Sequence, residues 1–301
     1  MLEGVSVVIT TVKRIDELDR AIDSVLKQSY KKLEIIVVVD GGDKDTLHFL
    51  QKYPFIKIIS NVPSVGGAES RNLGIRAATM PWVALLDDDD EWLEDKIQLQ
   101  LSSLQEFGPV NNIVSFTSLF TYVKNQSHQY ILPREKYISG QNVGDYLFTL
   151  NKGRWNGWIQ TSTLMALRET FLNIPFDPTL PKHQDWDWIM KVYDKGIPII
   201  HVNEPLSIYH KQTGIGKSVS QKALWNFSEN WINNHRQGIS EKAYSDFIIS
   251  VVNNGISKDR GLSLSNKLRE ITYRFKKLSA KNILSLSSVR FTLQYVYNII
   301  R

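Results

Sequence analysis

Short apolar runs alternate with segments of helical periodicity through the first hundred residues, and this alternation constrains the fold more than any other feature. Leu18, Ile22 and Val25 share one helical face, whereas the runs before and after them are rich in β-branched residues. A repeated strand-helix-strand order favours a parallel sheet with helices on both sides. The sequence therefore predicts an α/β domain on a mostly parallel central sheet, with strands over Val5–Thr10, Leu33–Val39, Phe55–Ser60 and Trp82–Leu86 and a further helical face at Leu93, Ile97, Leu101 and Leu104.

The pattern changes beyond about residue 110, where longer aromatic-rich runs appear at Ile113–Val123 and Trp158–Leu167. Helical spacing returns at Trp186–Asp194 and Gln221–Asn234. We interpret this region as an α+β half that continues the same sheet, followed by a helical C-terminal extension. The predicted boundaries are 1–110, 111–215 and 216–301.

Positive charge is concentrated in the last part of the chain. Residues 258–301 hold ten Lys or Arg against Asp259 and Glu270, a local +8, so the total of +5 leaves −3 for residues 1–257. A mildly acidic body does not favour nucleic acid as a partner. Within the basic tail, the segment 285–301 has apolar residues that alternate as in a strand and also share a helical face, and we favour the helix. The tail fits an anionic membrane surface. The alternative is a cationic helix pair that faces only solvent.

The chain contains no cysteine, so neither a disulfide framework nor a thiolate metal site is available. Any metal would be held by carboxylates, histidine or water, which indicates Mg²⁺ or Mn²⁺. The N-terminus enters a strand without the features of a signal peptide, and no run of about 18 apolar residues is present. We therefore expect a cytoplasmic protein whose tail contacts the inner face of the membrane.

Four consecutive aspartates, Asp87 to Asp90, follow the predicted strand Trp82–Leu86. Two like charges ~4 Å apart repel by roughly 4 kcal/mol at an effective dielectric near 20, so the run favours a bound cation. We expect Asp90 to cap a helix that begins near Glu91. The alternate side chains of Asp87 and Asp89 leave an extended chain on one side and can converge on one divalent ion that also holds a diphosphate.

A second carboxylate candidate, Asp185, lies about a hundred residues later at the start of a predicted helix. Tryptophans cluster around it, and Trp158 and Trp186 are candidate contacts for the apolar face of a sugar. The alternatives are a first-turn role for Asp185 and ordinary core positions for the tryptophans.

Two further positions carry weaker signals. The glycine-bearing segment Gly66–Asn72 opens a helix and could place Arg71 against a diphosphate, although Arg71 could also be a surface residue. Asp40 follows the second strand and could bond a nucleotide base or ribose, or could be a plain Asp-Gly turn residue.

The histidines show no local ligand spacing, so we expect structural roles for His128, His201 and His210. His210 also precedes the glycine-bearing segment 214–217, which could form a mobile lid. It is therefore the one histidine that we single out as a possible additional metal ligand.

The order of these features resembles the family-2 inverting glycosyltransferases over residues 4–210. The stretches that carry the resemblance are Val5–Thr11 with Arg14, Ala21–Tyr30, Glu34–Val38, Arg71–Ile75, Leu86–Trp92 and Gln184–Asp187. The resemblance implies a GT-A fold, with a nucleotide-sugar donor on the first half and an acceptor on the second. The acceptor implied is a saccharide or lipid-linked saccharide in surface polysaccharide biosynthesis.

The resemblance also implies roles for single residues. It makes Asp87 and Asp89 the D-x-D metal site, Thr10, Asp40 and Asp88 contacts to the base or ribose, Arg71 a phosphate contact and Asp185 the catalytic base. The chain departs from the family pattern where Val12-Lys13 replaces Tyr-Asn, Val39-Asp40 replaces two acidic residues and Gln184 replaces glutamate.

The mechanism that follows is a single displacement, in which Asp185 removes the proton of the acceptor hydroxyl and the anomeric configuration inverts. A nucleotidyltransferase acting on sugar phosphates would instead be expected to carry a glycine-rich loop after the first strand, where this chain has Thr10–Arg14. A catalytically silent saccharide-binding module would tolerate the loss of Asp185 or of the aspartate run, and both are present.

Overall fold

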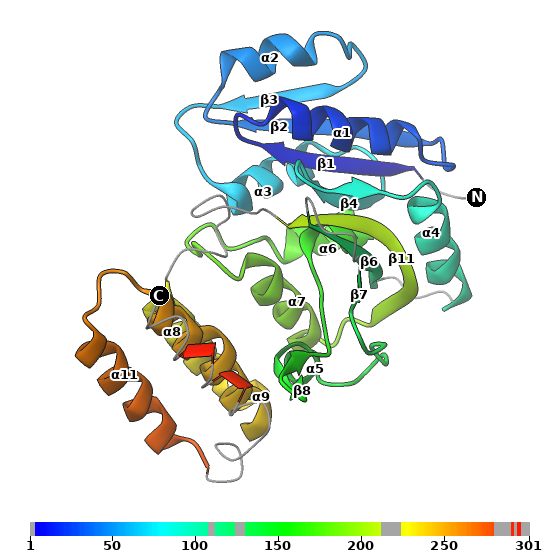
Figure 1. The fold of residues 1–301 in the computed structure, drawn as a ribbon. Helices are drawn as coiled ribbons and strands as arrows, with labels where there is room; N and C mark the ends of the chain where they lie inside the picture. Colours follow the sequence, from blue (N-terminus) through cyan, green and yellow to red (C-terminus); the bar gives the residue numbers. More distant parts are fainter. Residues whose placement is uncertain are drawn as a thin grey trace. The chain divides into compact units, whose positions relative to one another are not determined.

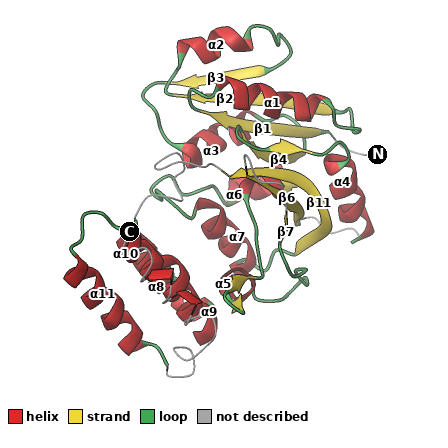
Figure 2. Cartoon of the chain, viewed as in Figure 1, coloured by secondary structure: helices red, strands yellow, loops and turns green. Residues whose placement is uncertain are grey.

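The computed structural model describes residues 4–107, 112–123, 130–211, 224–279, 290–291 and 294–295. The chain divides into two compact units, one formed by Met1–Gly140 with Ile159–Thr213 and the other by Gln141–Trp158 with Gly214–Arg301. The first unit holds the large sheet (Figure 1), and the second is mainly helical (Figure 2). The division into donor, acceptor and C-terminal regions is a functional one and stays a prediction.

The central sheet begins with four parallel strands, as the alternation in the sequence predicts. These are β1 (Val5–Thr11), β2 (Leu33–Asp40), β3 (Lys57–Asn61) and β4 (Trp82–Asp87), in the spatial order β3-β2-β1-β4. The sheet continues through β10 (Met165–Leu167), β6 (Val114–Val123), β11 (Ile199–Lys211) and β5 (Glu91–Trp92), and β7 (Tyr130–Leu132) pairs with β6. Because β10 runs antiparallel to both β4 and β6, the second half of the chain joins the same sheet and makes it mixed.

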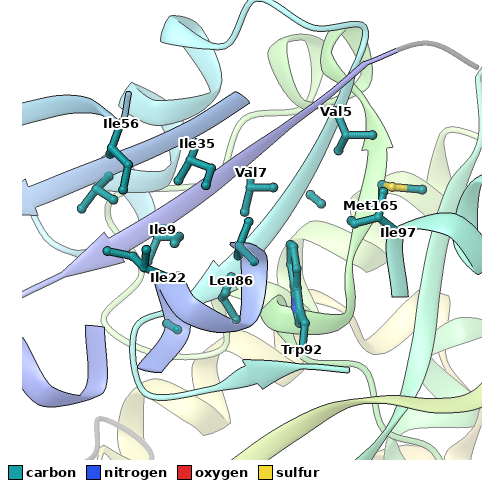
Figure 3. Packing of buried hydrophobic residues seen from close by; sticks show 14 of the residues in the cluster. Val5, Val7, Ile9, Ile22, Ile35, Ile56, Leu86, Trp92, Ile97 and Met165 are labelled. Atoms are coloured by element: carbon teal, nitrogen blue, oxygen red, sulfur yellow. The ribbon is translucent and has the colours of Figure 1, made fainter. Parts of the chain in front are cut away.

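Helices cover both faces of this sheet. One face packs against α1 (Ile15–Leu26), α2 (Lys44–Leu50) and α4 (Lys96–Glu106), whose apolar residues form one cluster with Val5, Val7, Ile9, Leu86 and Met165 (Figure 3). The opposite face carries α3 (Gly67–Ala77), which contacts β1 and β2. The other described helices of this unit are η1 (Thr161–Thr163), α6 (Arg168–Asn173) and α7 (Gln184–Asp194). Burial on both faces explains why these strands read as continuous apolar runs.

The close contact between α3 and the sheet depends on Gly74. A Cβ atom at this position would lie 2.3 Å from Cγ1 of Val8 and 3.2 Å from Cγ2 of Val38. The helix therefore approaches the sheet at a distance that only glycine permits.

Two boundaries differ from the sequence-based expectation. The strand expected from Phe55 begins at Lys57, and Phe55 is exposed. The expected cap at Asp90 is wrong, because the residues that follow it form strand β5 and the next helix, α4, begins only at Lys96. Pairing of Glu91 with Ile208 on β11 holds these residues in the sheet instead.

Strand β11 is bent in a way that matters for the site. Its register against β6 shifts between Val202 and Pro205 and again between Pro205 and Ser207. After these irregularities the strand pairs with β5, directly beyond the aspartate run. The C-terminal end of β11, including His210, is thereby brought beside the end of β4.

The second unit contains a small hairpin and a group of helices. Its elements are α5 (Val143–Phe148), β8 (Leu150–Asn151), β9 (Arg154–Trp155), α8 (Trp225–Asn234), η3 (Arg236–Gly238), α9 (Glu241–Phe247), η4 (Ile248–Asn253), α10 (Asn254–Lys258) and α11 (Leu264–Lys277). The rings of Phe148, Trp231 and Phe247 meet in its core. The expected helix over 285–301 lies outside the described residues, apart from 290–291 and 294–295.

We predict that Gly74→Ala lowers the free energy of unfolding by about 1–3 kcal/mol, because the added methyl group overpacks against Val8. The matched control is Gly238→Ala, where no atom lies within 4 Å of the new Cβ and the change should stay within about 0.5 kcal/mol. Urea unfolding of both variants followed by circular dichroism measures the difference. Equal stability of the two variants would contradict the packing argument.

Candidate active site

Polar side chains collect where β1, β2 and β4 end. Thr10 is paired with Asp87 across β1 and β4, and Asp40 is the last residue of β2. The carboxyl ends of parallel strands open on one edge of a sheet, which is where open α/β sheets bind ligands. The structure thus brings the predicted residues Thr10, Asp40 and Asp87 to one edge.

Arg71 joins three elements at this edge. From α3 its Nη2 donates to Oδ1 of Asp87 at 2.6 Å, and its Nη1 donates to Oε1 of Gln184 on α7 at 2.9 Å. Its guanidinium carbon also lies 5.7 Å from the centre of the Phe176 ring. Burial alone would lower the pKa of Arg71, but the charge and hydrogen bond of Asp87 together with the charges of Asp185 and Asp88 outweigh it, and the pKa is raised. Arg71 is therefore a buried, permanently charged link and not a surface residue.

The next two aspartates share a second arginine. Arg14, which follows β1, places Nη2 2.8 Å from Oδ1 of Asp88 and Nη1 2.7 Å from Oδ2 of Asp89. Asp88 is 1% exposed, and its burial raises its pKa to about 7 against the opposing effects of Arg14 and the Thr11 hydroxyl. Arg20 adds a hydrogen bond from Nη2 to the backbone oxygen of Asp89 at 3.0 Å.

Asp90 is fully buried and holds the strand end together. Its Oδ2 accepts hydrogen bonds from Nε2 of Gln160 and Oγ of Ser162, each at 2.6 Å, and its Oδ1 accepts one from the backbone N–H of His210 at 3.2 Å. The Ser162 hydroxyl also accepts from the backbone N–H of Asp87 at 3.0 Å. Burial raises the pKa of Asp90 well above its usual range. This role replaces the helix cap that the sequence predicted.

Gln160 and Ser162 are site residues that sequence reasoning missed. They stand in Trp158–Leu167, which reads as an apolar run, yet the polar residues Gln160, Thr161, Ser162 and Thr163 interrupt it. That interruption was the available signal. It becomes interpretable only when η1 is seen beside the aspartate run.

His210 lies next to the aspartates, as its proposed metal role requires. Its Nε2 is hydrogen-bonded to Oε1 of Glu91, and its ring centre is 4.9 Å from that of Tyr122. Burial and the charge of Arg20 lower its pKa below the usual histidine value. Metal ligation by His210 stays a prediction. His201 is structural, since its ring stacks on Phe116 and contacts the Ser118 hydroxyl, and His128 lies outside the described residues.

Asp185 occupies the first turn of α7, next to Gln184. Its Oδ1 accepts a hydrogen bond from the backbone N–H of Trp186 at 2.9 Å. Burial raises its pKa to about 6, while the Trp186 N–H and the charge of Arg71 act in the opposite direction. Arg71 therefore stands between Asp87 on β4 and the start of the helix that carries Asp185.

Asp40 is held by the protein on all sides. Its two carboxylate oxygens accept hydrogen bonds from Asn61, Ser64, Val65 and Gly66 at 2.5–3.0 Å. Burial would raise its pKa, but these four donors outweigh burial and lower it. Asp40 thus fastens the loop between β3 and α3, and its predicted contact to a nucleotide stays a prediction.

The tryptophans separate into different environments. Trp188 is 1% exposed and stacks on Phe171 and Phe176 at 4.5 and 5.5 Å, so it belongs to the core. Trp186 is partly exposed and stacks on His183 at 4.8 Å. Trp158 belongs to the second unit. Sugar contacts by Trp158 and Trp186 stay predictions.

The donor set at the end of β4 suits a hard divalent cation. Asp87 and Asp89 offer carboxylate oxygens, and each already attracts a guanidinium group to 2.6–2.7 Å. No group of three or more His, Asp or Glu side chains that could hold a metal occurs among the described residues. Two carboxylates fit Mg²⁺ or Mn²⁺ when substrate phosphates and water supply the remaining ligands.

Solved structures resemble this chain along almost its whole length. TarS of S. aureus superposes with a TM-score of 0.61 at 15% identity and covers 98% of this chain, which spans 54% of that structure's length. A mannosyltransferase from Pyrobaculum calidifontis, PcManGT, solved in complex with GDP-Man and Mn²⁺, gives a TM-score of 0.57 at 14% identity over 100% of this chain and 88% of its own. At these identities the likeness shows the fold, which is the GT-A fold expected from the sequence.

Sequence relatives lie closer. The amylovoran biosynthesis glycosyltransferase AmsB of Erwinia amylovora is 30% identical over 73% of this chain and 75% of its own length. WfgD of Escherichia coli, a UDP-Glc:alpha-D-GlcNAc-diphosphoundecaprenol beta-1,3-glucosyltransferase, is 27% identical over 76% of this chain and 87% of its own length. The family model for glycosyl transferase family 2 matches residues 6–173, from β1 into α6, and the chain belongs to this family.

Proposed function

We propose that this protein is an inverting glycosyltransferase that moves a sugar from a nucleotide-sugar donor to a saccharide or lipid-linked saccharide acceptor. The observation that carries the proposal is the Arg71 network, which ties Asp87 at the end of β4 to Gln184 and so to the helix of Asp185. The side chain of Arg71 thus holds both Asp87, on the donor side of the proposed site, and the helix that carries Asp185, the candidate base. The name of AmsB supports a role in polysaccharide biosynthesis, and the name of WfgD supports a nucleotide-sugar donor and a lipid-linked acceptor.

The donor is proposed to lie at the carboxyl edge of β1, β2 and β4. Thr10 and Asp88 would contact the base or ribose, and Arg71 would face the diphosphate. Asp40 would act on the nucleotide through the loop of Asn61–Gly66 that it fastens. Asp87 and Asp89 would hold the divalent cation, which when bound neutralises charge on the departing diphosphate.

Asp185 is proposed as the general base. Its pKa of about 6 leaves it ionised at neutral pH yet more basic than an ordinary aspartate, which suits proton transfer from a hydroxyl. The acceptor oxygen gains electron density as that proton leaves and attacks the anomeric carbon opposite the diphosphate. One displacement of this kind inverts the anomeric configuration and leaves no bond between sugar and protein.

The C-terminal extension is proposed to contact an anionic membrane surface. On α11 the side chains of Arg269, Lys276 and Lys277 are exposed, together with Leu268 and Tyr273. Basic heads beside apolar side chains on one helix are typical of surfaces that bind at the lipid interface. Among the described residues, no helix is both long and apolar enough to span a bilayer.

We predict that Asp185→Asn lowers kcat by about 10²–10⁴-fold with little change in KM, because the amide cannot accept the proton of the acceptor. Asp194→Asn, at the exposed end of the same helix, is the control and should keep full activity. In the parent enzyme, kcat/KM should be constant above about pH 7 and fall as the pH drops through about 6, since Asp185 becomes protonated there. Near-normal transfer by a folded Asp185→Asn variant would exclude Asp185 as the base.

Donor and metal can be tested together by a thermal-shift panel of UDP-, GDP- and dTDP-sugars with and without Mn²⁺. One nucleotide should raise Tm more than the others, and more in the presence of Mn²⁺, because a ligand that binds only the folded state stabilises it. Asp89→Ala should abolish the part that depends on Mn²⁺, whereas Asp45→Ala, an exposed position on α2, should not. A full Mn²⁺ effect in Asp89→Ala would remove Asp89 from the metal site.

Membrane contact is tested by replacing the exposed Arg269, Lys276 and Lys277 with glutamine, which leaves the buried face of α11 intact. Three basic residues at about 1 kcal/mol each make about 3 kcal/mol, so partitioning onto anionic liposomes should fall roughly a hundredfold. The control replaces the exposed Lys32, Lys44 and Lys195 of the first unit, which removes the same charge elsewhere. Equal loss in both triple variants, or no loss in either, would contradict a membrane surface on α11.

A further inference from the structure

Arg14 has no part in the mechanism so far, although it touches two of the four consecutive aspartates. It lies between β1 and α1, at the residue that precedes the first turn of α1. Its guanidinium spans Oδ1 of Asp88 at 2.8 Å and Oδ2 of Asp89 at 2.7 Å. Among the described residues, these two carboxylates are the polar partners found for its side chain.

The two arginines at the aspartate run differ in how firmly they are held. The side chain of Arg71 is 12% exposed and is fixed by Asp87, by Gln184 and by the ring of Phe176. The side chain of Arg14 is 37% exposed, and in the described part of the chain its ion pairs go to Asp88 and Asp89. Arg14 can leave by rotating into solvent, whereas departure of Arg71 would break a buried network across three elements.

We propose that the Arg14 guanidinium is an internal occupant of the cation site, which neutralises Asp88 and Asp89 and must release Asp89 before a divalent cation can bind there. This inference rests on the proposed function, which makes Asp89 a metal ligand. A bidentate guanidinium is geometrically matched to carboxylate oxygens, so it competes for the same lone pairs that a cation would use.

The competition has a measurable consequence. A ligand that binds only the open form of a site has its apparent affinity reduced by the fraction of molecules in that form. Removing the guanidinium should therefore tighten the binding of metal alone. Arg14 would set the metal affinity of the enzyme low, so that the cation enters together with the donor diphosphate, which offers the arginine a new partner.

Arg20 provides a matched control for general electrostatics. Its side chain is 36% exposed, almost the same as that of Arg14, and it also approaches the aspartate run. Its hydrogen bond goes to the backbone oxygen of Asp89 and its ion pair to the carboxylate of Glu91. Replacing Arg20 removes one positive charge close by without opening the carboxylate.

The experiment measures the Kd of Mn²⁺ alone by electron paramagnetic resonance, with no nucleotide present. Arg14→Gln should bind Mn²⁺ about three- to tenfold more tightly than the parent, Arg14→Lys should stay closer to the parent, and Arg20→Gln should change by less than about twofold. An Arg14→Gln variant that is folded and binds Mn²⁺ no more tightly than Arg20→Gln overturns the proposal.

Loss of Arg14 could unfold the protein, because it leaves the buried Asp88 without its counter-charge. The double variant Arg14→Gln with Asp88→Asn removes both charges of that pair and should bind Mn²⁺ more tightly than Asp88→Asn alone; no gain of the folded double variant over Asp88→Asn overturns the proposal. Asp89→Ala separates the proposal for Arg14 from the assignment of Asp89 as a metal ligand. Loss of Mn²⁺ binding in Asp89→Ala without a gain in Arg14→Gln refutes the role of Arg14 alone, whereas full Mn²⁺ binding in Asp89→Ala refutes the metal site itself.

Discussion

The ion pair between Arg71 and Asp87, closed at 2.6 Å, sets the arrangement of the site. A permanently charged guanidinium in the protein interior requires a counter-charge and hydrogen-bond acceptors, and Asp87 and Gln184 supply both. Because the three residues come from β4, α3 and α7, the requirement to satisfy one cation fixes the end of the strand against two helices. Gly74 contributes from the other side, since it lets α3 lie close enough to the sheet for Arg71 to reach the strand end.

The four consecutive aspartates have separate tasks because each meets a different partner. Asp87 faces Arg71, Asp88 and Asp89 face Arg14, and Asp90 accepts three hydrogen bonds from the protein. Four adjacent carboxylates would repel one another strongly. Two arginines offset the charges of the first three, and neutral hydrogen-bond donors stabilise the fourth, Asp90. Asp90 is therefore part of the framework, whereas Asp87, Asp88 and Asp89 pair with arginines, for which a substrate or cation can compete.

The sequence predicted the parts of the fold that depend on local periodicity. The parallel strands and the apolar face of α1 follow from spacing alone, and the carboxyl edge of the sheet follows from the topology. The role of Asp90 could not be predicted, because it depends on pairing of Glu91 with Ile208, more than a hundred residues away. For the same reason Gln160 and Ser162 were missed, and the four donors on Asp40 appear only when the loop after β3 has folded back.

The number of donors around each carboxylate separates framework from chemistry at this edge. Asp40 accepts four hydrogen bonds, and these lower its pKa, so it stays ionised. Its role is to hold the loop between β3 and α3 in place. Asp185 accepts a hydrogen bond from the backbone N–H of Trp186, but burial prevails, so that its pKa rises to about 6. A base that accepts a hydroxyl proton needs an environment like that of Asp185. Poor solvation keeps its carboxylate basic, and the nearby charge of Arg71 keeps it ionised at neutral pH. The same arginine that holds Asp87 therefore also limits how far the pKa of Asp185 can rise.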